Sequence, residues 1–394
     1  EQAGEVRWTQ LESDLTRLNW SLLKLVYGEA MTKKSTVFAR VVLVADQKAR
    51  LWWSGWAALV FLLTAALVNL NATSMHGYYR NCLSEMWLIG LPGMGRSIPL
   101  ARLETTSKGA PYQLINATVH LKGKRGDKEK PPSDVFLFTR SYCGSDRTGY
   151  LPTDAYGDGT YDLANAMAVS GAAVTPSQVQ NPLLALLLLL SNSRLGQWLP
   201  NPGATAPVSL PQGLRFWLHK IGPVPLRLML DLGRPAERRD FCFVSDGGHL
   251  DNLGLRALLA RRCRVIIISD ATCDPESGFR YFMTNVRWAR MEHGIEFHGL
   301  GDVPEDLGLA RLCPDPRTRL ARKHWIAARI EYPANPSAGE PAMTGLLVIL
   351  KPSFTGDEEI DLIHYRAEAA AFPHDPTADQ FYDPDKFESY RQLG

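Results

Sequence analysis

The sequence predicts an α/β fold in which helices cover a largely parallel β-sheet, with a helical, apolar segment at the N-terminal end. Two short apolar runs at 241–245 and 265–269 flank helical composition at 254–262, the strand–helix–strand pattern of a βαβ unit. A charge-free stretch at 51–70 has the length of a membrane-spanning helix. The 394 residues are 45% hydrophobic and 21% charged, a composition typical of a folded protein.

The chain is expected to have three parts. Residues 1–50 form an amphipathic helical segment, because apolar side chains recur every three or four positions from Trp8 to Leu25. A packing helix, a short coiled coil and a membrane-surface helix all fit this stripe. Residues 51–70 are the apolar stretch, and residues 76–394 are the globular part.

The apolar stretch reaches about 30 Å at about 1.5 Å per residue, which is the thickness of a bilayer core. Trp52, Trp53 and Trp56 lie at one end, where aromatic side chains gather at a membrane surface. We therefore predict a transmembrane helix; the alternative is a helix buried in a large domain. Lysines and arginines are concentrated before the stretch, which by the positive-inside rule places that side in the cytoplasm.

Within the globular part, residues 114–121 and 134–139 are expected to be strands, joined by a charged hairpin loop at 122–132. Residues 144–161 are rich in glycine and are expected to be a loop. The leucine run at 183–190 is too short to span a membrane and indicates a buried or lipid-facing helix.

The later elements follow the βαβ unit. Apolar side chains at helical spacing predict one face of a helix from Phe279 to Ala289. Residues 344–350 are expected to be a late strand. Asp270 directly follows the strand at 265–269, and we expect it to serve as a turn or cap residue.

Composition excludes several classes of protein. Lys plus Arg number 43 and Asp plus Glu 41, so the net charge of +2 argues against a nucleic-acid partner. The six cysteines form no C-x-x-C pair, which argues against a zinc knuckle or a disulfide scaffold. Nucleotide-binding glycine motifs and H-E-x-x-H are absent from the sequence, so we expect no cofactor and no metal.

The stretch S-D-G-G-H-L-D-N-L-G at 245–254 lies between a predicted buried strand and a helix. Asp246 would stand at the carboxyl end of the strand, where catalytic groups collect in open α/β sheets. Gly247 and Gly248 would permit a sharp turn and leave room for a substrate. Asn252 could cap the following helix. The alternative interpretation is an ordinary Asp-Gly-Gly turn.

This stretch resembles the D-G-G motif of the patatin-like phospholipases, in which the aspartate ends a strand and an asparagine and a helix follow. Residues 166–176 are similar to the small-residue segment that precedes the motif in this family, and residues 116–118 are similar to an earlier N-A-T. The resemblance is to large membrane-associated bacterial members, and it spans roughly residues 66–394. The segments that resemble family sequences are residues 68–81, 245–254, 372–383 and 387–394.

The resemblance implies a lipid acyl hydrolase in a bacterial inner membrane, with a patatin-like sheet covered by helices. In the family, a serine in a G-x-S-x-G turn attacks the ester carbonyl, and the aspartate is its base without an intervening histidine. Asp246 would be that base, and Gly247, Gly248 and His249 would adjoin the substrate. The substrate would be a phospholipid or another lipid ester. Arg80, just after the apolar segment, could bind lipid phosphate or form a structural ion pair.

The sequence departs from the family pattern because it contains no G-x-S-x-G. Ser170 lies in the nearest form, Ala-Val-Ser-Gly-Ala, and is the alternative nucleophile. We expect the true elbow upstream of Glu1, so that this chain is the C-terminal portion of the catalytic domain and is inactive alone. Two other possibilities are a membrane scaffold without the serine, and a metal site formed by Asp246, His249 and Asp251.

Overall fold

The computed structural model describes most of the chain, and the chain divides into two units. The described residues are 36–88, 97–103, 110–121, 132–174, 192–204, 222–231, 234–301, 303, 306–376, 379 and 383–394. The units are Glu1–Val68 and Asn69–Gly394. The expectations for the stripe from Trp8 to Leu25, for the loop itself at 122–131 and for the leucine run at 183–190 lie outside the described residues.

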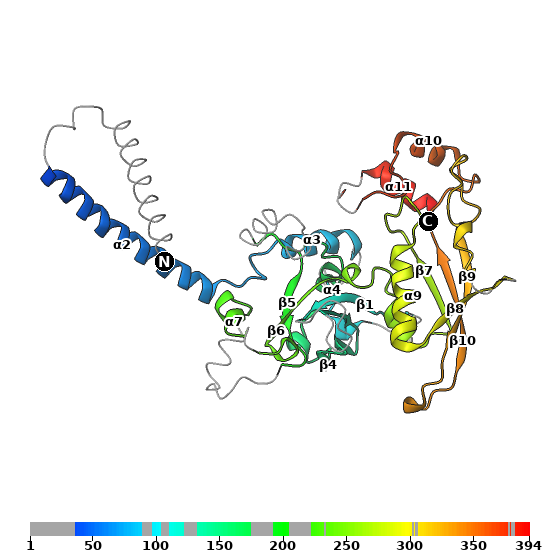
Figure 1. Ribbon diagram of the computed structural model, residues 1–394, viewed down its shortest axis with the longest axis horizontal. Coiled ribbons are helices and arrows are strands. Elements are labelled where there is room, and N and C mark those ends of the chain that lie inside the picture. Colours follow the sequence, from blue (N-terminus) through cyan, green and yellow to red (C-terminus); the bar gives the residue numbers. More distant parts are fainter. Residues whose placement is uncertain are drawn as a thin grey trace, which may run out of the picture. The chain divides into compact units, whose positions relative to one another are not determined.

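The described part of the first unit is one helix, α2 (Thr36–Leu67), drawn in blue in Figure 1. Its portion Ala49–Leu67 is long and apolar enough to cross a membrane, and only 6% of that window is buried. The helix therefore covers most of the predicted apolar segment, and it is not buried in a domain core. Thr64 bonds its hydroxyl to the Val60 carbonyl at 2.7 Å, so this polar side chain is satisfied within the helix.

The first sheet of the second unit has six strands in the order β4-β3-β2-β1-β6-β5, and every neighbouring pair is antiparallel. Its strands are β1 (Ile115–His120), β2 (Ser133–Phe138), β3 (Tyr142–Ser145), β4 (Gly149–Pro152), β5 (Gln197–Pro200) and β6 (Phe241–Asp246). Phe136, Phe138 and Val244 are fully buried in its core. The helix α4 (Leu163–Ser170) contributes to the same core through Ala166 and Val169.

The segment 144–161 is not the loop that its glycines suggested, because β3 ends and β4 lies within it. A Cβ at Gly144 would approach the Gly149 carbonyl oxygen to 2.1 Å. The glycine there allows the two strands to approach each other closely, so it marks strand pairing rather than a break in structure.

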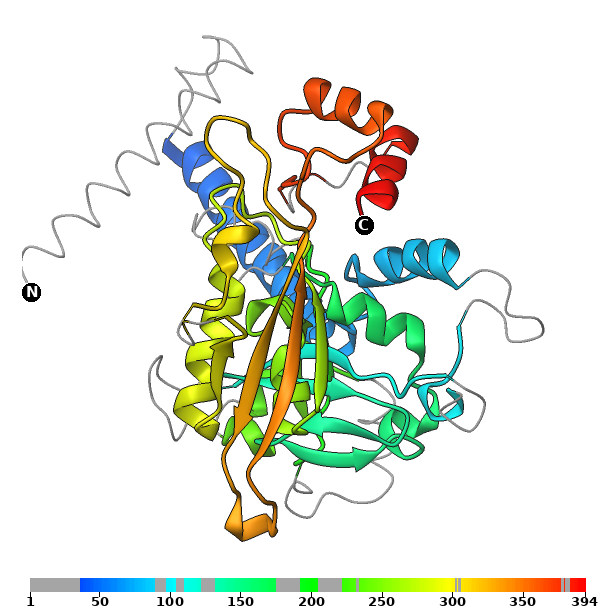
Figure 2. The same ribbon diagram turned by 90° about the vertical axis from the view of Figure 1, so that its right-hand side faces the viewer.

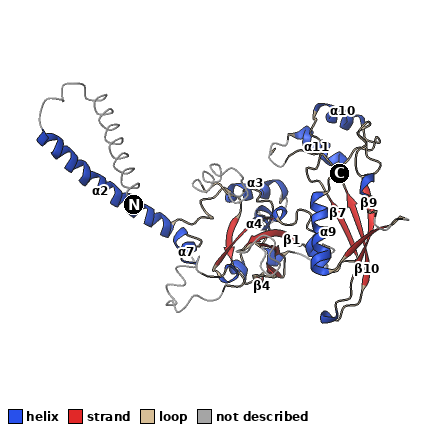
Figure 3. Cartoon of the chain, in the orientation of Figure 1, coloured by secondary structure: helices blue, strands red, loops and turns tan. Residues whose placement is uncertain are grey.

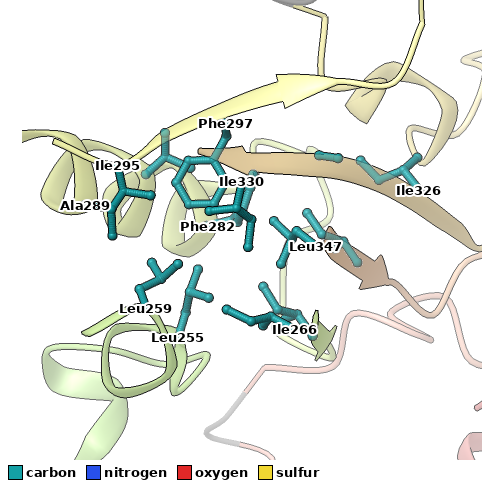
Figure 4. Close-up of a cluster of buried hydrophobic side chains, with 14 of the residues drawn as sticks. Leu255, Leu259, Ile266, Phe282, Ala289, Ile295, Phe297, Ile326, Ile330 and Leu347 are labelled. Carbon is teal, nitrogen blue, oxygen red and sulfur yellow. The ribbon is translucent and has the colours of Figure 1, made fainter. Parts of the chain in front are cut away.

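The second sheet has the order β7-β10-β9-β8, with only β7 and β10 parallel. Its strands are β7 (Val265–Ser269), β8 (Glu296–Gly299), β9 (Trp325–Tyr332) and β10 (Met343–Leu350). One face packs against α8 (Leu255–Ala260) and α9 (Arg280–His293), as Figures 2 and 4 show. Strand residues alternate, so Ile266 and Ile268 are buried whereas Val265 and Ile267 are exposed.

The predicted βαβ unit is wrong in its pairing, although its strands and helix all form. β6 belongs to the first sheet and β7 to the second. β6 pairs with β1 on one edge and with β5 on the other, both antiparallel, which leaves no free edge for β7. The parallel partner of β7 is β10 instead. The fold is therefore mixed α/β (Figure 3), with a mainly antiparallel arrangement of strands.

Four further α-helices lie in the described part of the second unit. They are α3 (His76–Trp87), α7 (Pro225–Leu230), α10 (Ile360–Glu368) and α11 (Pro384–Leu393). A small separate core of Phe354, Leu362 and Phe372 packs with residues of α10 and α11.

Candidate functional site

Asp246 is the last residue of β6 and the first of a tight turn. Its Oδ1 accepts the Gly248 N–H at 2.5 Å and thereby caps a one-turn 3₁₀ helix, η8 (Gly247–His249). Asp246 is half-buried, and its backbone pairs with that of Ala117 in the neighbouring strand β1. In the described part of the chain, the Gly248 N–H is the one hydrogen-bond donor on this carboxylate. Its second oxygen can therefore accept a proton.

Both glycines of the turn are required by close packing of the protein itself. A Cβ at Gly247 would lie 2.6 Å from the Asn116 carbonyl oxygen and 2.9 Å from its Nδ2. A Cβ at Gly248 would lie 2.3 Å from Asn252 Oδ1. Sequence reasoning expected this space to be left for a substrate, but protein atoms occupy it.

Asp251, rather than Asn252, accepts a hydrogen bond from a backbone N–H in the first turn of α8. The Asp251 carboxylate is 2% exposed and accepts the Arg256 N–H at 2.8 Å and the Asn285 Nδ2–H at 2.7 Å. The predicted capping role of Asn252 is therefore wrong. These bonds also occupy Asp251 structurally, and Asp246, His249 and Asp251 do not form a metal-binding group. Among the described residues, the group with suitable spacing is His324, Asp357 and Glu358.

The electrostatics around Asp246 involve one carboxyl, one imidazole and one phenol. Burial raises the pKa of Asp246, and the Gly248 N–H and the nearby His249 partly oppose this increase. Burial also lowers the pKa of His249. The pKa of Tyr79, on α3, is raised by burial and by the Asp246 charge. The proton affinity of Asp246 is therefore above that of an exposed aspartate.

Ser170 lies close to this turn, at the C-terminal end of α4. Its Oγ donates to the Asn116 carbonyl at 2.7 Å, the same carbonyl that faces Gly247. Tyr79 donates to the adjacent Gly171 carbonyl at 3.1 Å. Ser170 therefore stands at the end of a helix, whereas a nucleophile elbow is a strand-to-helix turn. Its hydroxyl bonds a backbone carbonyl and not the Asp246 carboxylate.

Arg80 forms the structural ion pair that was one of its two expected roles. Its guanidinium pairs with Asp162, which caps α4 by accepting the Asn165 N–H at 2.7 Å. The side chain is 24% exposed. This contact connects α3 to the start of α4, which positions the helix that carries Ser170.

Sequence reasoning missed two residues of the site, His120 and Ser245. The Ser245 hydroxyl lies 2.7 Å from His120 Nε2 and 2.8 Å from His249 Nδ1, and Ser245 is fully buried. Burial and the neighbouring His249 lower the pKa of His120 to about 4. A histidine within a predicted apolar strand was the available signal, but the sequence did not show that β1 lies beside β6.

Asp270 has the turn role that we expected. Its Oδ1 accepts both the Thr272 N–H at 3.1 Å and the Thr272 hydroxyl at 2.6 Å. Its other oxygen lies 3.6 Å from Lys351 Nζ, and both side chains are 2% exposed. The pair joins the carboxyl ends of the parallel strands β7 and β10.

The fold and site define a mixed α/β protein that carries a half-buried aspartate on a glycine turn, preceded by an exposed apolar helix. No protein-family model, curated protein or solved structure compared with the chain matches it.

Proposed function

We propose that the protein is a lipid acyl hydrolase in which Asp246 is the general base of a Ser–Asp dyad. The observation that carries this proposal is the state of the Asp246 carboxylate. One oxygen is fixed by the Gly248 N–H, and the other has no donor among the described residues. A carboxylate held in this way can accept the proton of a hydroxyl within hydrogen-bond reach. The resemblance of residues 245–254 to patatin-like phospholipases supports the same assignment.

The proposed reaction has two half-reactions. The serine oxygen attacks the ester carbonyl carbon while its proton moves to Asp246. The C–O bond to the alcohol then breaks, and the alcohol leaves with that proton. Water next attacks the acyl-enzyme, again giving its proton to Asp246, and the fatty acid leaves as the serine regains its proton. No cofactor or metal is needed for either half-reaction.

No serine or threonine hydroxyl bonds Asp246 in the described part of the chain. Because the serine precedes the aspartate in the family that residues 245–254 resemble, we propose a nucleophile upstream of Glu1. Ser170 is the alternative within the chain. The same observation would fit a membrane scaffold that keeps the fold without a nucleophile, which is the second candidate function. Identifying the serine that reacts with an electrophile separates these three cases.

A serine-directed fluorophosphonate probe makes that identification. The complete polypeptide that contains this chain should release fatty acid from phospholipid vesicles and should be labelled at a serine preceding Glu1. The 394-residue chain alone should not be labelled. Labelling at Ser170 would show that the nucleophile is within the chain, and absence of both labelling and hydrolysis in the complete polypeptide would favour the scaffold.

The membrane is the proposed location, and a bacterial inner membrane is the one that the resemblance implies. Trp52, Trp53 and Phe61 of α2 are between 60% and 69% exposed. In the second unit, α7 also presents an apolar stripe to solvent, since Met229 is 62% and Leu230 76% exposed. Exposed apolar side chains of this size are typical of surfaces that contact lipid or another protein.

An arginine in the middle of α2 should weaken membrane insertion. Leu59→Arg places a charge near the centre of the candidate span Ala49–Leu67, at a cost of about 2.5–3.5 kcal/mol. The matched control is Leu51→Arg, near the end of the span and next to Arg50, where the side chain can reach the membrane surface. The fraction of protein that resists alkaline carbonate extraction should fall for Leu59→Arg alone. Equal extraction of both variants would contradict a spanning helix.

A further inference from the structure

The helix α3 turns its polar side chains toward the protein and its apolar side chains toward solvent. His76 and Ser84 are buried, and Arg80 pairs with Asp162 at the start of α4. The apolar side chains on the outer face, here called the α3 stripe, are Met75, Tyr78, Cys82 and Met86. All four are exposed, the three larger ones to between 52% and 72%. A helix inverted in this way indicates a surface that something other than water covers.

The short helix α7 has the same arrangement. Its outer apolar side chains, here called the α7 stripe, are Leu226, Met229 and Leu230, which are 41%, 62% and 76% exposed. Their spacing of three and four residues places them on one face of the helix. On another side, Arg227 pairs with Asp240 at 2.9 Å and lies 4.7 Å from the centre of the Phe241 ring. The polar side of α7 is therefore attached to the start of β6, and its apolar side is left open.

A backbone hydrogen bond holds α7 close to the point where the candidate span ends. The helix α2 ends at Leu67, and the second unit begins two residues later, at Asn69. Two residues extend the chain by at most about 7 Å. The Leu70 N–H then donates to the Pro223 carbonyl at 3.0 Å, and α7 begins at Pro225. The α7 stripe is thus near the end of the span whatever the angle of α2.

The segment that connects α2 to α3 is fixed on the second unit by side-chain hydrogen bonds. Asn71 Nδ2 donates to the Trp198 carbonyl at 2.6 Å, and Asn71 Oδ1 accepts the Trp198 N–H at 3.0 Å. Asn192 Nδ2 donates to the Leu70 carbonyl at 2.8 Å. Because this segment is bonded to β5 and leads directly into α3, the α3 stripe is also held near the end of the span.

We propose that the α3 stripe and the α7 stripe dock the second unit onto the lipid bilayer at the end of the span. A spanning helix brings a bilayer surface to its own end, so apolar stripes held there meet lipid. The exposed polar residues Asn81 and Glu85 border the α3 stripe, and Tyr78 has an apolar ring with a polar tip, both typical of a helix in the membrane interface. This inference rests on the membrane location in the proposed function and not on the chemistry of Asp246.

Cys82 is a native reporter of the α3 stripe. The two exposed cysteines are Cys82 and Cys273, so in Cys273→Ser an environment-sensitive thiol fluorophore should attach at Cys82, as peptide mapping would verify. In the 394-residue protein in phosphatidylcholine nanodiscs, lipid with a nitroxide near its head group should quench this fluorophore several-fold more than aqueous iodide does. The matched control, Cys82→Ser labelled at Cys273, should show the reverse. Equal quenching by iodide at both sites would overturn the proposal.

The α7 stripe is tested in the variant that lacks both exposed thiols. A fluorophore on Met229→Cys should be quenched by the nitroxide lipid and protected from iodide. Ile360→Cys is the control, because Ile360 is 85% exposed at the start of α10 and belongs to neither stripe. Both native side chains are exposed, so neither replacement disturbs the core. Quenching of the Met229→Cys label by iodide as strong as that of the Ile360→Cys label would overturn the proposal.

Two further outcomes separate this inference from its alternatives. Labels protected from both quenchers, together with oxidative cross-linking of Cys82 between two chains, would overturn lipid docking in favour of a contact between two copies. Equal carbonate extraction of Leu59→Arg and Leu51→Arg, with lipid quenching of both stripes retained, would overturn the spanning helix but support the docking surface. Fluorescence quenching does not require ester hydrolysis, so its result is independent of the proposed Ser–Asp dyad.

Discussion

Asp246→Asn should reduce kcat/KM for phospholipid hydrolysis by the complete polypeptide by about 10²–10⁴-fold, the usual contribution of a general base. The asparagine Oδ1 can still accept the Gly248 N–H, so the turn is kept. The amide cannot take up a proton, so only the chemical step is lost. Hydrolysis rates measured over a range of lipid concentrations should show the loss in kcat rather than in KM.

Asp158→Asn is the matched control. Asp158 is exposed and has a φ of 56°, a conformation that asparagine also adopts readily, so this variant removes one negative charge without strain. It should retain full activity. Turnover by Asp246→Asn within a few-fold of this control would contradict the role of Asp246 as the base.

The raised pKa of Asp246 fixes the sign of two pH effects. The base must be ionised, so kcat/KM should fall as the pH falls through the pKa of Asp246, which lies above that of an exposed aspartate. Stability has the opposite dependence, because the folded protein holds the Asp246 proton more tightly than the unfolded chain does. The contribution of this proton to the free energy of unfolding is therefore present at low pH and is lost as the pH rises through the folded pKa. Asp246→Asn should therefore not lower the Tm at pH 7.

Lys351→Met should destabilise the folded protein by about 3–5 kcal/mol, because it leaves Asp270 as a buried charge without its cation. Lys351 Nζ and Asp270 Oδ2 are 3.6 Å apart, and both side chains are 2% exposed. Lys351 Nζ has no hydrogen-bond partner in the described structure and lies 5.7 Å from the centre of the Phe279 ring. Asp270 is thus the nearest opposite charge to the buried Lys351, whereas Asp270 also accepts two hydrogen bonds from Thr272. Urea unfolding followed by circular dichroism measures the change.

Two further variants make this prediction specific. Arg290→Met breaks an exposed pair, with Arg290 55% and Glu296 41% exposed, and should cost at most about 1 kcal/mol. The double variant Lys351→Met with Asp270→Asn should recover part of the loss, because no isolated charge remains. A loss for Lys351→Met no larger than that for Arg290→Met would show that the buried pair does not contribute as argued.

Local features of the fold were predictable because they depend on the order of side chains along the chain. The strand at 265–269 was predicted with its observed bounds, because a short run of apolar β-branched residues strongly favours a β-strand. The apolar segment was predicted as a helix for a similar reason. The hairpin at 142–152 was missed, because glycine at a site of close strand approach resembles glycine in a loop.

The antiparallel pairing of β1 with β2 agrees with the predicted hairpin, whereas pairings between strands distant in sequence were not predictable. The interval from β6 to β7 has the composition of a βαβ unit, yet β1 and β5 occupy both edges of β6. The same pairing brings His120 to Ser245 across 125 residues of sequence. The motif around Asp246 could be recognised from the sequence because it is local, and the role of Asp246 as a base stays a prediction. Its neighbours Tyr79 and His120 come from distant segments, and only the folded structure brings them together.

A structure of the complete polypeptide with a phosphonate bound tests the central claim most directly. We expect the phosphonylated serine oxygen to lie about 2.6–3.2 Å from the free oxygen of Asp246, or to be joined to it by one water molecule. A reactive serine whose nearest base is another side chain, with Asp246 beyond the reach of a bridging water, would contradict the assignment.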